Sequence, residues 1–280
     1  MSYHWGQGFH TRGADGHFYC ELLTSAPAGS GELVRIRSLP SLGANTRNDA
    51  VREAEVEAEF LWPAVRGRNV EPFDVSDSGQ YVIAPYDTAM SDKPLSVDEL
   101  MSRAPHLYDY LEPWIERLSN RSAYQLSIDG DHPWPILGPW AHLRRGSHLV
   151  MTRYMHPNKT PPAAVRLARF DQRLGMTTTA YPNNKVNFIA ADSESEAHYI
   201  AAWINAPACQ EAIARFVSST TIPPAALERL PIPKFDAGDP LHAELARLGS
   251  ECYQVARQGE DYSPLVGQIG VFRHECGEFP

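Results

Sequence analysis

Two arginines stand on either side of a glycine in "FLWPAVRGRNVEPF", residues 60–73, directly behind an apolar run. Trp62 and Val65 are expected to anchor this segment, because apolar side chains of this size are usually buried. Arg66 and Arg68 would then project from a rigid base. A guanidinium can make two parallel hydrogen bonds, either to O6 and N7 of guanine or to phosphate oxygens. The segment therefore indicates a nucleic-acid contact, and pairing of Arg66 with a nearby glutamate is the open alternative.

Amide and basic side chains elsewhere in the chain fit the same kind of ligand. Asn183, Asn184 and Asn187 carry amides, which can bond to N6 and N7 of adenine. The alternative for the Asn-Asn pair is a simple turn. Tyr154 and the threonine run at 177–179 can add hydroxyl contacts. Phosphate contacts, which fix the register of a protein on DNA without reading its sequence, suit the side chains of Arg144, Arg145, Lys159 and Lys185.

The charge of the chain is acidic overall but unevenly distributed. The net charge is −9, which argues against a protein that coats nucleic acid nonspecifically. Residues 142–173 nevertheless hold seven lysines and arginines, Arg153 among them, against the single acid Asp171. This basic island predicts a polyanion bound at one face. A solvated basic loop is the alternative.

Catalytic motifs were sought and are missing. The chain has no HExxH, no GxSxG, no phosphate loop, no dinucleotide-binding turn, and no Asn-Pro-Pro-Tyr motif of an amino-group DNA methyltransferase. Asp129, Asp131 and His132 could form a metal cluster in a hydrolase, but Asp and Gly before Pro133 are also typical of a turn. We therefore predict a non-catalytic chain without a metal.

Length and cysteine spacing define the broad class. The 280 residues are enough for one large domain or two small ones. No apolar run approaches the roughly 20 residues of a transmembrane helix, and the first residues lack the features of a secretory signal. The four cysteines lie far apart, which predicts reduced thiols. We expect a cytoplasmic protein with no membrane partner.

The elements expected from the sequence make an α+β fold, strand-rich in front and helical behind. β-Type runs bounded by turn residues predict strands at 16–23, 31–39, 80–87 and 147–155. A hairpin is expected over 176–191, with its turn at the Asn-Asn pair. Helix-forming composition, apolar periodicity and capping residues predict helices at 48–62, 96–118, 193–219 and 240–258.

Local signals set the boundaries of several of these helices. Ser96 and Glu99 form the pattern of a capping box. Pro113 predicts a break or kink within the following helix. Asn205 is expected to end one helix and to cap the next, with Pro207 tolerated in its opening turn. Residues 227–235, "LERLPIPKF", are expected to be extended.

The order of several phrases resembles the target-recognition region of adenine-N6 DNA methyltransferases. Relatives of this kind include type IIG restriction–modification enzymes, BREX-type and TaqI-like methyltransferases and, more distantly, HsdS specificity subunits. The resemblance covers about residues 6–236, in the phrases "GFHTRGADGHFY", "FLWPAVRGRNVEPF", "YVIAPYD", "LYDYLEPWIERLSNRSAY", "NKVNFIAA", "YIAAWINAPACQEAIARF" and "LERLPIP". The sequence departs from the pattern at Ile204–Ala206, where relatives have Leu-Asn-Ser, and in its Thr11-Arg12-Gly13 opening.

The resemblance implies a target-recognition domain over 1–236, with helices at 194–218, followed by a C-terminal helix and tail at 237–280. Its function would be to recognise a specific sequence of double-stranded DNA and to position it for a partner adenine-N6 methyltransferase in restriction–modification or phage defence. S-adenosylmethionine would bind to that partner and not to this chain. Met1 favours a separate subunit over a piece of a longer chain.

The alternative is a protein-interaction module of the same complex that does not touch DNA. The residues expected to contact DNA are Thr11, Arg12, Arg66, Arg68, Arg144, Arg145, Arg153, Tyr154, Lys159, Asn183, Asn184, Lys185 and Asn187.

Overall fold

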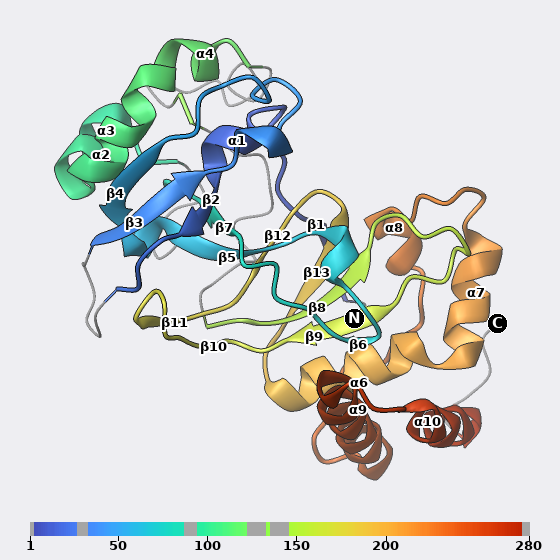
Figure 1. Cartoon of the computed structure of the whole chain (residues 1–280). Coiled ribbons are helices and arrows are strands. Elements are labelled where there is room, and N and C mark those ends of the chain that lie inside the picture. The colour runs from blue at the N-terminus through green and yellow to red at the C-terminus, as the bar shows by residue number, and fades with distance from the viewer. Residues whose placement is uncertain (1–2, 27–32, 87–93, 122–132, 135–145, 276–280) are drawn as a thin grey trace.

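The fold is α+β, as the sequence predicts. Two sheets, each with its own helices, form two lobes that lie side by side in Figure 1. A separate two-stranded hairpin, β10 (Arg169–Asp171) and β11 (Met176–Thr178), lies below the first lobe in that view. The computed structural model describes residues 3–26, 33–86, 94–121, 133–134 and 146–275.

The first lobe contains a six-stranded sheet in the order β12-β5-β7-β2-β3-β4. Its neighbouring strands are antiparallel, except for the parallel pair β12 and β5. The strands are β2 (Tyr19–Leu22), β3 (Leu33–Ser38), β4 (Glu53–Glu57), β5 (Leu61–Val65), β7 (Tyr81–Ile83) and β12 (Tyr181–Pro182). Among the described residues, the short helices that pack on this lobe are α1 (Asp15–Phe18), α2 (Val97–Arg103), α3 (Pro105–Leu111) and α4 (Ile115–Ser119).

The second lobe contains a five-stranded sheet in the order β1-β13-β8-β9-β6. Helix α6 contacts β8 and β9, and α9 packs on α6, so that a helical layer covers this sheet (Figure 1). The strands are β1 (Gly6–Gln7), β6 (Phe73–Asp74), β8 (His148–Arg153), β9 (Ala163–Arg166) and β13 (Val186–Ala191). The helices are α6 (Glu194–Asn205), α7 (Pro207–Phe216), α8 (Pro224–Leu227), α9 (Pro240–Gln258) and α10 (Ser263–Glu275).

The helix expected at 48–62 is wrong, because residues 53–57 form strand β4. Its register places Val56 opposite Val34, and both side chains are fully buried. On the exposed face Glu53 lies opposite Arg37 and pairs with it at 3.0 Å. Helix-forming composition is thus overridden by cross-strand packing and charge pairing, which decide strand formation more than intrinsic preference does.

The hairpin expected over 176–191 is also wrong in its pairing. The turn at 183–186 exists, since the N–H of Val186 donates to the carbonyl of Asn183 at 2.9 Å. Its two arms enter different sheets, however: β12 pairs with β5 in the first lobe, and β13 pairs with β8 and β1 in the second. The turn therefore lies where the two lobes meet.

The strand expected at 16–23 is shorter than predicted, because its first residues belong to α1. Gly16 packs too closely for a side chain: an added Cβ would lie 2.2 Å from the hydroxyl oxygen of Thr46. The strands expected at 31–39, 80–87 and 147–155 are confirmed as β3, β7 and β8.

The expected start of α2 is confirmed. The Ser96 hydroxyl accepts the N–H of Glu99 at 3.2 Å, and the Glu99 carboxylate accepts the N–H of Ser96 at 2.7 Å. The break expected at Pro113 is confirmed as the 3₁₀ turn η4 (Glu112–Trp114), between α3 and α4.

The two helices expected over 193–219 are confirmed as α6 and α7, and Pro207 lies in the first turn of α7. Asn205 ends α6 as predicted, but its side chain does not cap α7. Its amide instead donates to the carbonyl of Ala163 at 2.7 Å and accepts the N–H of the same residue at 2.9 Å. The side chain thus joins the end of the helix to β9.

The helix expected at 240–258 is confirmed as α9, whereas α10 after it was not predicted. Leu245 and Leu248 of α9 are buried in the same hydrophobic cluster as Ile200 of α6, so residues beyond 236 belong to the second core. In the described part of the chain, no helix is both long enough and apolar enough to cross a membrane.

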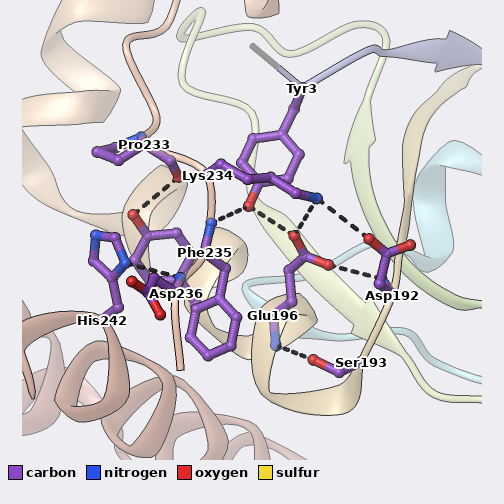
Figure 2. A network of polar contacts seen from close by, with 10 residues as sticks. Tyr3, Asp192, Ser193, Glu196, Pro233, Lys234, Phe235, Asp236 and His242 are labelled. Carbon is purple, nitrogen blue, oxygen red and sulfur yellow. Dashed lines mark hydrogen bonds and ion pairs between the residues drawn. The ribbon is translucent and has the colours of Figure 1, made fainter. Parts of the chain in front are cut away.

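A polar network ties three distant segments of the second lobe together (Figure 2). The buried carboxylate of Glu196 accepts hydrogen bonds from the Tyr3 hydroxyl at 2.9 Å and from Lys234 Nζ at 2.6 Å. It also accepts the N–H of Asp192 at 2.7 Å. The Tyr3 hydroxyl in turn accepts the N–H of Phe235 at 3.0 Å. The N-terminal segment, α6 and the extended segment before α9 are thereby joined.

Candidate nucleic-acid interface

The segment that carries Arg66 and Arg68 has the rigid apolar base that the sequence predicts. It follows β5, whose five residues are all buried, with Trp62 only 1% exposed. The chain then forms a 3₁₀ turn, η3 (Gly67–Asn69), in which the Asn69 side chain accepts the N–H of Arg66 at 3.0 Å. Arg66 is half-buried and Arg68 is exposed.

Gly67 brings this segment against the turn at 183–186. An added Cβ on Gly67 would lie 2.9 Å from the carbonyl oxygen of Lys185 and 3.3 Å from its Cβ, so the approach requires a glycine. Next to it, the N–H of Asn183 donates to the carbonyl of Val65 at 2.9 Å. Two segments that the sequence suggested separately are therefore direct neighbours in space.

Arg12 approaches the same turn from the N-terminal segment. Its backbone is left-handed, at φ +54°, and its N–H donates to Nδ1 of His10 at 2.9 Å. The pKa of His10 is lowered first by burial and then by the charges of Arg12 and Lys185. Both cations therefore lie near this imidazole. We name Arg12, Arg66, Arg68 and Lys185 the turn cluster.

The positive charges of the turn cluster are not paired with carboxylates of the described residues. Among the described residues, none of its four members makes an ion pair within 4.0 Å. The guanidinium of Arg66 lies over the ring of Tyr19, 5.7 Å from its centre. The alternative that Arg66 pairs with a preceding glutamate is not observed there, because Glu53 pairs with Arg35 and Arg37, and Glu59 pairs with Arg103.

Further polar groups surround the cluster. Lys185 Nζ lies 6.0 Å from the ring centre of Tyr154, whose N–H donates to the carbonyl of Lys185 at 2.9 Å. The Gln7 amide donates to the carbonyl of Asn184 at 2.7 Å, and the Asn184 side chain is half-buried. Gln7 and His10 were missed by sequence reasoning, because only the pairing of β1 with β13 brings the N-terminal segment here.

Three of the expected contact residues are buried in the protein and cannot reach a duplex in this arrangement. Thr11 is 1% exposed and its hydroxyl donates to Asp15. The Asn183 side chain accepts the N–H of Lys185 at 3.0 Å, and the Asn187 amide donates to the carbonyl of Ile222 at 2.8 Å. These side chains hold the turn and its surroundings in place, so their expected role as DNA contacts is corrected to a positioning role.

The expected role of Arg153 is corrected as well, because this side chain is occupied. Its guanidinium donates to the carbonyl of Val70 at 2.8 Å and pairs with Glu71. Lys159 lies in the loop after β8, with a left-handed backbone at φ +59°. Arg144 and Arg145 lie outside the described residues.

The basic island of residues 142–173 is divided by the fold. Arg153 ends β8, whereas Arg166 on the neighbouring β9 lies opposite Leu149. Four residues of strand separate the two positions, which is roughly 13 Å. Arg166 and Arg169 instead line a second cleft with α9. The described part of the island is therefore not one continuous patch.

No group of three or more potential metal ligands is found among the described residues, and Asp129, Asp131 and His132 lie outside them. The described cysteines Cys20, Cys209 and Cys252 are buried. No family model matches the chain, and no curated protein sequence matches it.

Proposed function

We propose that this chain recognises a specific sequence of double-stranded DNA and positions the duplex for a partner adenine-N6 DNA methyltransferase. The observation that carries the proposal is the turn cluster, in which Arg12, Arg66, Arg68 and Lys185 gather and make no ion pair within 4.0 Å among the described residues. Cations collected in this way favour a polyanionic ligand, because each phosphate contact also releases counterions from DNA.

The rigid support of the cluster favours recognition of DNA bases over nonspecific electrostatic attraction to the DNA backbone. Arg66 and Arg68 flank a glycine locked against Lys185, and β5 behind them is fully buried. A guanidinium held by a fixed backbone loses little freedom when it bonds to the two acceptors of guanine. The half-buried amide of Asn184 beside it can serve adenine in the same way. The methyltransferase partner is proposed because the order of several sequence segments resembles the target-recognition region of adenine-N6 DNA methyltransferases.

A salt titration of the whole chain on duplexes selected from a random pool tests the proposal. If about five phosphates are neutralised, log affinity should fall with log salt at a slope near −4.5. Arg66→Ala/Arg68→Ala should weaken binding to the selected duplex by roughly thirtyfold or more, since two bidentate base contacts are removed and each is worth about 1–3 kcal/mol. Binding to a scrambled duplex should change less if the arginines read bases.

Arg35→Ala/Arg37→Ala is the matched control, because it removes the same charge from the exposed face of β3, where both side chains pair with Glu53. This variant should bind DNA nearly as the wild type does. A wild-type slope near zero would contradict the proposal and favour the protein-interaction module. An equal loss on selected and scrambled duplexes would assign Arg66 and Arg68 to the phosphates.

A further inference from the structure

A second cleft, of about 570 Å³, lies between the β10–β11 hairpin and α9. It is distinct from the turn cluster and shares no residue with it. Its charged lining consists of four arginines and three aspartates: Arg166, Arg169, Arg173, Arg257, Asp74, Asp77 and Asp171. In the described part of the chain, none of these arginines makes an ion pair within 4.0 Å. The arginines and aspartates that line the cleft are therefore not paired with one another.

Two of the arginines converge on one tyrosine hydroxyl. Arg169 donates to the Tyr253 hydroxyl at 2.7 Å, and Arg257 donates to the same oxygen at 3.1 Å. Both guanidiniums also lie 5.5 Å from the centre of the Tyr253 ring. Two like charges are thus held against one side chain, and a further anion bound between them would be attracted to both.

The hydroxyl itself is left with a hydrogen to donate. A phenol oxygen has two lone pairs, and both are used by the guanidiniums. Tyr253 is only 3% exposed, and no acceptor for its hydrogen is found among the described residues. A buried donor without an acceptor is costly. The site therefore offers donors from Tyr253, Arg169 and Arg257 together.

Asp171 does not fill this site, because both of its carboxylate oxygens are used elsewhere. One oxygen of Asp171 accepts the N–H groups of Arg173 and Leu174 in the hairpin turn, and the other accepts the Tyr81 hydroxyl at 3.1 Å. Asp77 accepts the N–H of Gly79 at 2.9 Å. These carboxylates fix the loops around the cleft.

We propose that Arg169, Arg257 and the Tyr253 hydroxyl form a binding site for a phosphate group. A phosphate offers several acceptor oxygens and no obligatory donor, which matches two guanidinium forks and one hydroxyl hydrogen. Arg166, at the end of β9 in the same cleft, adds a further positive charge. The phosphate can belong to a small ligand or to a nucleic-acid backbone, and the proposal holds for either source.

The first arm of the test uses inorganic phosphate. Thermal unfolding of the whole chain is measured with increasing phosphate, against chloride at equal ionic strength. The wild-type Tm should rise with concentration, because a ligand that binds only the folded state stabilises it. Arg169→Ala/Arg257→Ala should weaken the apparent phosphate affinity roughly tenfold or more, since hydrogen bonds to charged groups are strong. Tyr253→Phe keeps the ring and should weaken it less.

The second arm uses duplex DNA. If the site binds a backbone phosphate, Arg169→Ala/Arg257→Ala should make the slope of log affinity against log salt less negative by about 0.9. Arg215→Ala/Arg229→Ala is the charge-matched control: Arg215 lies on α7, which is well away from the hairpin in Figure 1, and Arg229 lies over Phe216 of the same helix. It should leave both readouts unchanged.

The two arms distinguish a small phosphate ligand from a DNA backbone phosphate. They also distinguish failure of the phosphate site from failure of the proposed function. A phosphate-dependent Tm that is lost in the Arg169/Arg257 variant supports a small phosphate ligand, and a changed slope without a Tm response supports a backbone phosphate. The absence of both effects would overturn the proposed phosphate site. If the wild type does not bind DNA, the proposed function fails, and the thermal arm alone decides on the phosphate site.

Discussion

At the scale of single residues, the turn cluster and the buried histidines show opposite treatments of charge. Arg12, Arg66, Arg68 and Lys185 gather around one turn and, among the described residues, make no ion pair within 4.0 Å. A polyanionic ligand would supply their missing charge partners. His17 is instead held neutral inside the first lobe, because burial lowers its pKa.

His17 should make the stability of the protein depend on pH. It is 3% exposed and stacks on Trp114 at 4.1 Å between ring centres. Burial, opposed by Asp49 at 3.6 Å, lowers its pKa to about 4. The unfolded chain, with a histidine pKa of about 6.5, binds more protons between these values, so stability is full above pH 6.5 and falls as pH drops.

The expected loss from His17 between pH 7 and pH 5 is about 2 kcal/mol. Urea unfolding at the two pH values measures it in the wild type and in His17→Phe, which keeps a ring against Trp114 but cannot bind a proton. The variant should lose about 2 kcal/mol less than the wild type over this interval. His4→Phe, at a side chain that is 88% exposed, is the control. An equal pH dependence in wild type and His17→Phe would refute the assignment.

At the scale of elements, local signals located most helices and several strands, and they failed where pairing partners decide. The capping box at Ser96 and Pro207 in the opening turn of α7 are local and were found. The prediction of a helix at 48–62 failed because β4 is held by the pairing of Glu53 and Val56 with residues of β3, which lie outside that stretch of sequence. The hairpin expected over 176–191 failed because its arms join different sheets.

The difference between local signals and contacts of distant segments also explains how much of the candidate site could be predicted from the sequence. The rigid base of Arg66 and Arg68 could be predicted, since it depends on a local apolar run before a glycine. The contact of Gly67 with Lys185 could not, because more than a hundred residues separate them in sequence. The burial of Asn187, which made it a structural residue, likewise depends on a distant carbonyl at Ile222.

The network around Glu196 is expected to hold the helical layer of the second lobe in place. Glu196→Ala would leave the Tyr3 hydroxyl without its acceptor and Lys234 without its 2.6 Å partner. We expect a loss of roughly 2–4 kcal/mol in the free energy of unfolding, because these groups are partly or fully buried. Glu194→Ala, on the same turn of α6 but 56% exposed, should cost far less. Urea denaturation measures both, and similar losses would contradict the role of the network.

At the scale of the whole molecule, neither lobe is a continuous piece of chain. Strand β6 lies between β5 and β7 in sequence but belongs to the second sheet. Strand β12 belongs to the first sheet, between segments of the second. The chain therefore crosses between the lobes several times, and the turn cluster lies at one of these crossings, between β12 and β13. Its geometry depends on both lobes being folded.

This interleaving predicts that the two lobes unfold together. Ile36→Ala should remove roughly 2–5 kcal/mol from the core of the first lobe, where Ile36 is fully buried. Hydrogen exchange measured by mass spectrometry then reports protection in each lobe separately. Amides of β13 and α6 in the second lobe should lose as much protection as those of β3, because their slowest exchange requires opening of the whole molecule. Loss confined to the first lobe would show that the second folds without it. The turn cluster would then have to be assembled after folding, because one of its sides would be free to move.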